Sequence, residues 1–142
     1  MKPLEIGTFN IGQKAELIRK VTAKDIALFA EITGDDNPVH LDETYAAQTT
    51  FGKCIAHGIY SAGLISAVLG TKLPGPGAIY VSQKLAFRRP VFVDDTITAF
   101  AEITNIDLDR NRIHLKTGCI NQFGKITAEG ESELLIPKSQ QT

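Results

Sequence analysis

Cysteine is scarce in this chain of 142 residues, which contains two, Cys54 and Cys119. They lie far apart and lack the CxxC spacing of zinc and redox motifs, so the sequence predicts neither kind of motif. Reduced thiols are the default for such cysteines in a cytoplasmic protein, and the cytoplasm is the location that we expect.

An excess of charge of one sign is also missing. The chain has 15 Lys and Arg residues against 16 Asp and Glu residues, a formal net charge of -1, and no basic block. Proteins that bind nucleic acid or an anionic membrane surface depend on concentrated positive charge. We therefore expect neither partner.

Long apolar runs are absent as well. The stretch "MKPLEIGTFNIGQKAELIRK" has no continuous apolar core followed by a small-residue cleavage signal, so we expect no secretory peptide. The most apolar run, "CIAHGIYSAGLISAVLG" at 54–70, contains a histidine, two serines and three glycines and is short for a membrane span. We interpret it as a buried core helix.

Length and composition fit one globular domain. The hydrophobic fraction of 43% is ordinary for a protein with a packed core, and 142 residues leave little for a second domain. We expect residues 1–142 to form a single domain, with its core at about 12–136 and a polar tail, "PKSQQT", at 137–142.

The first half of the chain has one strand and then helical signals. Residues 13–21 alternate well enough for a strand. Thr22 and Asp25 have the spacing of a capping box at the start of a helix that Gly34 ends. An apolar helix covers about 58–69, is apolar nearly all round and is therefore predicted to be buried, and "LPGPG" ends it.

The second half alternates with period two, at 78–87, 95–104, 111–121 and 125–136. The polar joints "DLDRN" and "NQFG" are short enough for antiparallel hairpins. One apolar helix and a long sheet must bury each other, so we predict an α+β fold with a curved antiparallel sheet wrapped around the helix. The remaining edge strand and apolar surface favour a homodimer.

Ionisable groups are concentrated in "GDDNPVHLD", residues 34–42. Asp35 and His40 are separated by Asn37 and Pro38. Because proline fixes its own φ and disfavours helix at the preceding residue, we expect a rigid bend and not a turn of helix. A rigid bend can aim both side chains at one small volume, as positioning a water molecule requires.

The predicted helix that begins near Gly58 supplies a second chemical element. Its first N–H groups have no partner within the helix and carry the positive end of the dipole. Glycine there allows a substrate to approach the backbone, so this end can hold a developing oxyanion. A carboxylate, an imidazole and a free N–H donor together suit acyl-thioester chemistry.

A purely structural interpretation fits the same residues. Asp-Asp-Asn-Pro is a good turn whose carboxylates can be solvated, and His57 can simply pack or form a hydrogen bond. Lys84, Arg88 and Arg89 can form a solvated sheet face, and Ser66 can bond back to the preceding turn of its helix. No serine or cysteine has a nucleophile-elbow context, so the sequence does not support a covalent acyl-enzyme.

A long motif favours the functional interpretation. "TGDDNPVHLDETYAAQTTFGKCIAHGIYSAGLISAVLG", followed by "LPGPGAIYVSQKLAFRRPVFVDDTITAFAEI", resembles the hydratase-2 motif of MaoC-like, (R)-specific enoyl-CoA hydratases. The resemblance extends over about 12–136. It implies a hot-dog fold, in which the sheet wraps the long helix, and usually a dimer.

The resemblance also assigns roles to individual residues. It implies that Asp35 and His40 are catalytic, that Asn37 helps to hold the loop, and that the N–H of Gly58 forms the oxyanion site. Ser66 matches a serine proposed to orient the catalytic groups or the thioester.

The implied reaction is the reversible hydration of a trans-2-enoyl-CoA to the (R)-3-hydroxyacyl-CoA, a hydro-lyase activity of fatty-acid metabolism. It needs no metal or redox cofactor, and coenzyme A enters as part of the substrate, with Lys84, Arg88 and Arg89 as candidates for its phosphates. A hot-dog acyl-CoA thioesterase and a non-catalytic acyl-CoA-binding module are the alternatives. The pairing of Asp35 with His40 on one bend favours hydration.

Overall fold

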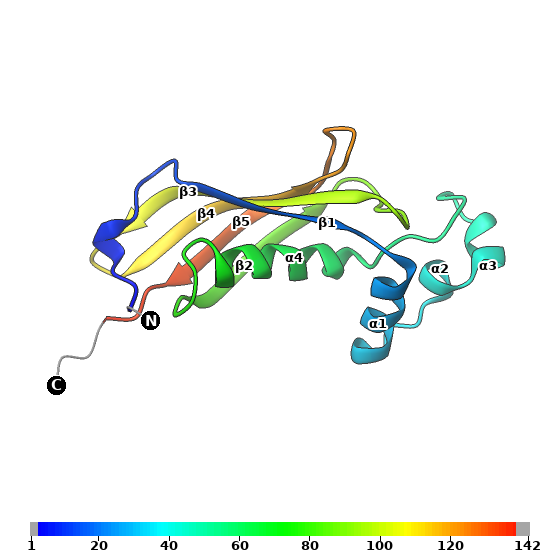
Figure 1. Ribbon diagram of the computed structural model, residues 1–142, viewed down its shortest axis with the longest axis horizontal. Helices are drawn as coiled ribbons and strands as arrows, with labels where there is room; N and C mark the ends of the chain where they lie inside the picture. Colours follow the sequence, from blue (N-terminus) through cyan, green and yellow to red (C-terminus); the bar gives the residue numbers. More distant parts are fainter. Residues whose placement is uncertain (1–2, 139–142) are drawn as a thin grey trace.

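The computed structural model describes residues 3–138 and consists of one five-stranded sheet with its helices (Figure 1). The elements, in chain order, are η1 (Ile6–Thr8), β1 (Lys14–Lys20), α1 (Ala23–Thr33), α2 (Pro38–Leu41), α3 (Glu43–Ala47), α4 (Gly58–Thr71), β2 (Ile79–Phe87), β3 (Thr96–Asp107), β4 (Arg112–Ile120) and β5 (Ile126–Leu135). From residue 139 on, the predicted polar tail lies outside the described residues.

The sheet is antiparallel throughout, with the strand order β1-β3-β4-β5-β2. The two predicted hairpins are present as the β3–β4 and β4–β5 pairs. Figure 1 shows α4 along one face of the sheet, whereas α1, α2 and α3 lie together beyond one end of it. The predicted α+β architecture, a curved sheet packed around one long helix, is thus confirmed.

The core lies between α4 and the sheet. The period-two pattern of β3 and β4 places one face of each strand against the helix, as predicted, because alternate side chains of a strand point to the same side. The buried residues on these faces and on α4 are Ile97, Ala99, Ala101, Ile103, Ile113, Leu115, Thr117, Cys119, Ser61, Leu64, Ile65, Val68 and Leu69. Burial of each large aliphatic side chain stabilises the fold by about 1.5–3 kcal/mol.

The prediction that the apolar helix is buried all round is wrong for one face of α4. Ile59, Gly63, Ser66 and Gly70 form an exposed stripe along the helix, and Ile59 is 61% exposed. The physical reason is that a single sheet covers only one side of a helix, so the far side needs a second surface to cover it.

The prediction that Asn37–His40 is a bend without a helical turn is also wrong. Pro38 is the first residue of α2, a single helical turn that carries His40. Proline is well suited to this position because its missing N–H has no partner in the first turn of a helix and its φ is already helical. The Asn37 side chain caps the turn by accepting a hydrogen bond from the N–H of Val39, at 3.1 Å.

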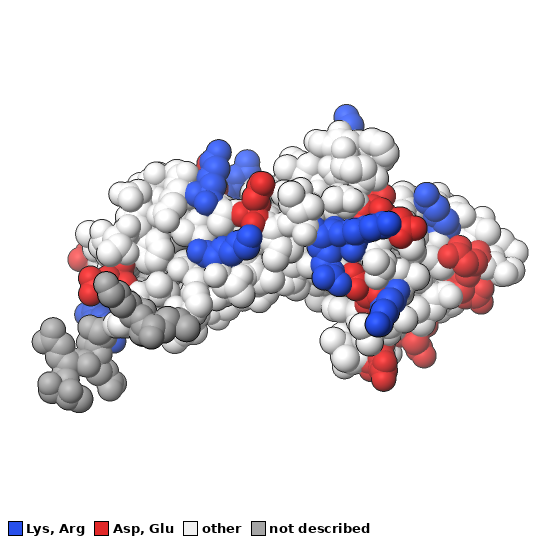
Figure 2. Space-filling view, in the orientation of Figure 1, with Lys and Arg blue, Asp and Glu red and all other residues white. Residues whose placement is uncertain are grey.

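On the face shown in Figure 2, basic and acidic side chains are interspersed over the surface. Among residues 3–138, no helix is long and apolar enough to cross a membrane.

Candidate active site

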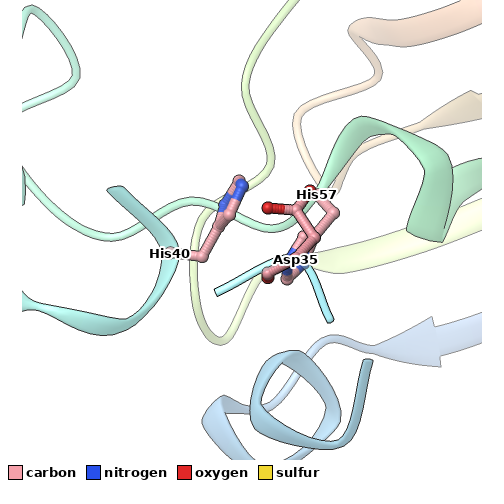
Figure 3. Close-up of side chains that lie close together, drawn as sticks. All are labelled: Asp35, His40 and His57. Atoms are coloured by element: carbon pink, nitrogen blue, oxygen red, sulfur yellow. The ribbon is translucent and has the colours of Figure 1, made fainter. Parts of the chain in front are cut away.

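Three side chains from separate parts of the chain meet beside the N-terminus of α4. Asp35 lies in the loop after α1, His40 lies on α2, and His57 immediately precedes α4. One carboxylate oxygen and one ring nitrogen from each histidine lie within 4.8 Å of one another (Figure 3). The structure therefore brings the predicted pair, Asp35 and His40, together and adds His57 to it.

Local hydrogen bonds shape the loop that holds Asp35. Gly34 ends α1 in the left-handed region, with φ of 81°, which glycine adopts without strain. The N–H of Asp35 donates to the Thr33 hydroxyl at 3.2 Å, and the N–H of Asn37 donates to Oδ1 of Asp35 at 3.3 Å. Asn37 in turn caps α2, so it links the carboxylate to the turn that carries His40.

The ring of His40 has a defined orientation. Its Nδ1 lies 2.7 Å from the carbonyl oxygen of Ile55. A carbonyl can only accept, so Nδ1 carries the proton and, in the neutral ring, Nε2 is left with a lone pair. His40 can therefore orient a water molecule or accept a proton through Nε2.

His57 contacts both members of the pair. Its Nε2 donates to the backbone carbonyl of Asp35 at 2.8 Å, and its ring stacks on that of His40 with centroids 3.8 Å apart. The ring of Phe29, on α1, lies on it at a centroid distance of 4.6 Å. Sequence reasoning assigned His57 to packing or hydrogen bonding; its position next to Gly58 was the one sign of a closer connection to the site.

Gly58 is the first residue of α4, and within the described part of the chain its N–H has no hydrogen-bond partner. This N–H and the positive end of the helix dipole both favour the binding of a negatively charged group at the start of α4. A Cβ atom at this position would lie 3.0 Å from the ring of Phe87. Glycine therefore keeps the helix start accessible and lets Phe87 pack against it.

A cavity of about 460 Å³ opens at this helix start. Its lining includes His57, Gly58 and Ser61 from the segment that begins α4, together with Phe51, Phe87, Arg88 and Arg89. Ser61, which is buried, is a polar group of the cavity that sequence reasoning missed, because nothing in "HGIYSAGLIS" distinguishes it from Ser66.

Only some of the other predicted site residues line this cavity. Arg88 and Arg89 line it, whereas Lys84 lines a separate hollow on the sheet together with Arg88. Arg88 pairs with Glu129 at 3.4 Å. Ser66 is eight residues beyond Gly58, about 12 Å along the helix axis, on the exposed stripe of α4. The structure does not bring Ser66 to the Asp35–His40 pair.

A charged cluster fixes α1, and hence the loop that follows it, against β1 and α4. Arg19 donates to Asp25 through Nε at 2.9 Å and through Nη2 at 2.7 Å, and the Tyr60 hydroxyl donates to the same carboxylate at 2.8 Å. The hydrogen bonds from Arg19 hold the pKa of Asp25 well below its usual range, although burial opposes this. Burial, and then the bond to Asp25, raises the pKa of Tyr60.

The arrangement is chemically suited to moving the protons of a water molecule. Asp35, His40 and His57 also have the residue types of a metal site, and each imidazole donates one ring N–H to a backbone carbonyl. A carboxylate, an imidazole lone pair and an unpartnered N–H donor are what general acid–base catalysis with charge development on an oxygen requires. In the single chain, Asp35 is exposed, His40 half-buried and His57 buried.

Comparison with known proteins gives a consistent result. The family model for the MaoC like domain matches residues 8–122. A curated relative, the (R)-specific enoyl-CoA hydratase of Rhodospirillum rubrum, is 47% identical over 126 residues, which cover 89% of this chain and 87% of the relative. The 3-hydroxybutyryl-CoA dehydratase of Methylorubrum extorquens is 45% identical over 138 residues, or 97% of this chain and 84% of the relative.

Among solved structures, the (R)-hydratase from A. caviae involved in PHA biosynthesis superposes with a TM-score of 0.89 at 41% identity. The match covers 92% of this chain and 98% of that one.

Proposed function

The chain belongs to the family of MaoC-like domains, and on that basis we propose that it is an (R)-specific enoyl-CoA hydratase. It adds water to a trans-2-enoyl-CoA and forms the (R)-3-hydroxyacyl-CoA, and in reverse it acts as a dehydratase. Relatives at 41% and 47% identity have this activity by name. The observation that carries the proposal is the meeting of Asp35 and His40 beside the free N–H of Gly58.

The geometry supports a mechanism in which two residues hold the attacking water. The Asp35 carboxylate takes a proton from it as general base, while Nε2 of His40 orients it. The water oxygen bonds to the β-carbon, the conjugated double bond shifts, and the electron pair moves to the thioester oxygen as an enolate. The N–H of Gly58 stabilises that oxygen. The proton taken from the water then passes to the α-carbon, with His40 sharing in its transfer, which completes the addition and returns Asp35 to its carboxylate form.

Hydration is neutral in oxidation state, so it needs no redox cofactor, and we propose that it needs no metal either. Coenzyme A enters and leaves as part of the substrate. Arg88 and Arg89, on the lining of the cavity, are the better placed candidates for its phosphates, because Lys84 lies in the other hollow. Ser66 is too far along α4 to orient Asp35 directly, and we propose that it faces the acyl portion of the thioester.

A homodimer would explain the exposed apolar residues on one edge of the sheet. The edge strand β2 presents Ile79, Tyr80, Val81 and Phe87, each at least 37% exposed, and an apolar open edge favours pairing with another strand. The other edge, β1, carries the charged side chains of Lys14, Glu16, Arg19 and Lys20, which disfavour such pairing. Phe87 lies on β2 and also lines the cavity, so a partner on this edge also approaches the site and can help to shield it from bulk water. Two free cysteines agree with a cytoplasmic location.

Incubation with crotonyl-CoA tests the proposed reaction. Loss of the absorbance of the conjugated double bond with no release of thiol is the expected result. Release of one thiol per substrate consumed would instead indicate a hot-dog thioesterase, in which water attacks the carbonyl carbon. No change of either kind, with the substrate still bound, would indicate an acyl-CoA-binding module.

A further inference from the structure

We infer that His57 is a positioning residue that places the catalytic carboxylate of Asp35 against the start of α4. This inference rests on the proposed hydratase function and deepens it. His57 holds the backbone of Asp35 by a hydrogen bond, supports the ring of His40 by stacking, and is joined through the chain to Gly58. One side chain thereby connects the three elements that the reaction brings together.

The hydrogen bond to Asp35 is the long-range connection of an otherwise local loop. The other hydrogen bonds of Asp35 join residues two positions away, from its N–H to Thr33 and from the N–H of Asn37 to its carboxylate. The bond from Nε2 of His57 spans 22 positions and comes from the segment that begins α4. Without it, Asp35 would be connected to the segment that begins α4 only indirectly, through the bonds of Val39 and His40 to Ile55.

The ring of His57 is itself firmly placed. It is 3% exposed and lies in contact with two aromatic rings, those of His40, at 3.8 Å and an interplanar angle of 27°, and of Phe29, at 4.6 Å. Phe29 belongs to α1, which the cluster of Arg19, Asp25 and Tyr60 holds in place. A donor fixed in this way can fix the residue that accepts from it.

The chemistry of the ring excludes direct catalysis by His57. Nε2 is engaged with the Asp35 carbonyl, and Nδ1 is buried, with less than 1 Å² accessible and no hydrogen-bond partner among the described residues. Neither nitrogen therefore faces the substrate. A buried acceptor without a partner is unfavourable for stability, and phenylalanine would fill the same aromatic contacts without that cost. Histidine at this position is explained by the donor at Nε2.

This contrast gives a decisive variant, His57→Phe, which keeps an aromatic ring and loses the donor. We expect kcat for crotonyl-CoA hydration to fall about 10-fold to 100-fold, as for other small misplacements of a catalytic group, with KM within about twofold because the cavity lining is retained. The melting temperature should be equal or higher. His57→Gln, which keeps an N–H donor at the end of its side chain, should recover most of kcat. The matched control is His114→Phe on the sheet surface, which should leave kcat unchanged.

A double-mutant cycle distinguishes positioning from a general structural effect. If His57 acts through Asp35, His57→Phe should cause little further loss in an Asp35→Asn background. Wild-type kcat in His57→Phe, an equal loss in both backgrounds, or a loss that follows a lower melting temperature would each overturn the inference. If His57→Phe does not fold, His57→Met, which has no donor, can be compared with His57→Gln, which has one. If none of the three variants folds, His57 has a structural role instead.

The activity of the wild-type protein toward crotonyl-CoA distinguishes a failure of this inference from a failure of the proposed function. An active wild type with an equally active His57→Phe variant overturns the positioning role alone. A wild type that does not hydrate crotonyl-CoA overturns the proposed function and the inference together.

Discussion

The imidazole Nδ1 of His40 lies 2.7 Å from the carbonyl oxygen of Ile55, in the segment that leads to α4. This contact fixes the proton on Nδ1 and leaves Nε2 as the ring nitrogen that can orient a water molecule or accept a proton. The orientation of the ring is thus set by the backbone next to the oxyanion site. A small error in the path of residues 55–58 would disturb both parts of the site.

His40→Asn tests the role assigned to Nε2. The amide of asparagine can still donate to the Ile55 carbonyl but places no acceptor where Nε2 lies. We expect kcat for crotonyl-CoA to fall about 100-fold, as for loss of an acid–base group, with an unchanged melting temperature. Steady-state kinetics and thermal unfolding measure both. Activity within about threefold of the wild type would show that this nitrogen takes no part in the reaction.

Gly58→Ala tests the contact between the helix start and Phe87. The new methyl group would lie 3.0 Å from the Phe87 ring, which is exposed enough to move and lines the cavity. We expect KM for enoyl-CoA to rise several-fold, about 1 kcal/mol of binding, because the displaced ring enters the cavity. Adding Phe87→Ala makes room for the methyl group and should lower KM again. If the double variant has the same KM as Gly58→Ala, the rise in KM comes from a change in the backbone at residue 58 and not from the Phe87 ring.

The Arg19–Asp25 pair gives a prediction for stability against pH. The folded protein lowers the pKa of Asp25 below its unfolded value, chiefly through Arg19, so the stabilisation is present above about pH 4 and is lost as pH falls through the folded pKa. Asp25→Asn should lower the free energy of unfolding by about 2 kcal/mol at pH 7, which is the scale of hydrogen bonds to a charged group. The decrease should be smaller at pH 2.5. Urea unfolding of the wild type and the variant at pH 7 and pH 2.5 measures both differences. An equal loss of stability at the two pH values would contradict the prediction.

The open edge of β2 gives a prediction for assembly. Val81 is 41% exposed on this edge, and Val81→Lys places a charge where a partner strand would pair. We expect the variant to change from dimer to monomer in light scattering coupled to size-exclusion chromatography. Ile18→Lys on the other edge, where Ile18 is 64% exposed, is the matched control and should stay dimeric. A monomeric wild type, or dissociation by the control alone, would count against the β2 interface.

Sequence periodicity predicted the parts of the fold that depend on local rules. The faces of β3 and β4 follow from alternation, and the Thr22–Asp25 capping box and the left-handed Gly34 are present as expected. The turn at Pro38 was wrongly predicted because proline both breaks helices and begins them, and only the Asn37 cap decides between the two.

The candidate site was predicted in part, for a related reason. Asp35 and His40 lie close enough in the chain for one motif to indicate them, and the resemblance to MaoC-like proteins that includes them is confirmed. The contact between Asp35 and His57 spans 22 positions, and no local pattern specifies it. The exposed stripe of α4 depends on what the sheet leaves uncovered, so hydrophobicity alone predicted burial there.

The most direct test of the central claim is the rate of crotonyl-CoA hydration by Asp35→Asn. Asparagine keeps the shape of the side chain and its hydrogen bond with Asn37 but cannot take a proton from water. If Asp35, His40 and the Gly58 N–H act on one bound thioester, kcat should fall by at least about 100-fold, KM should change little, and the wild-type product should be the (R)-3-hydroxy enantiomer. An Asp35→Asn variant that forms this product at the wild-type rate would contradict the claim.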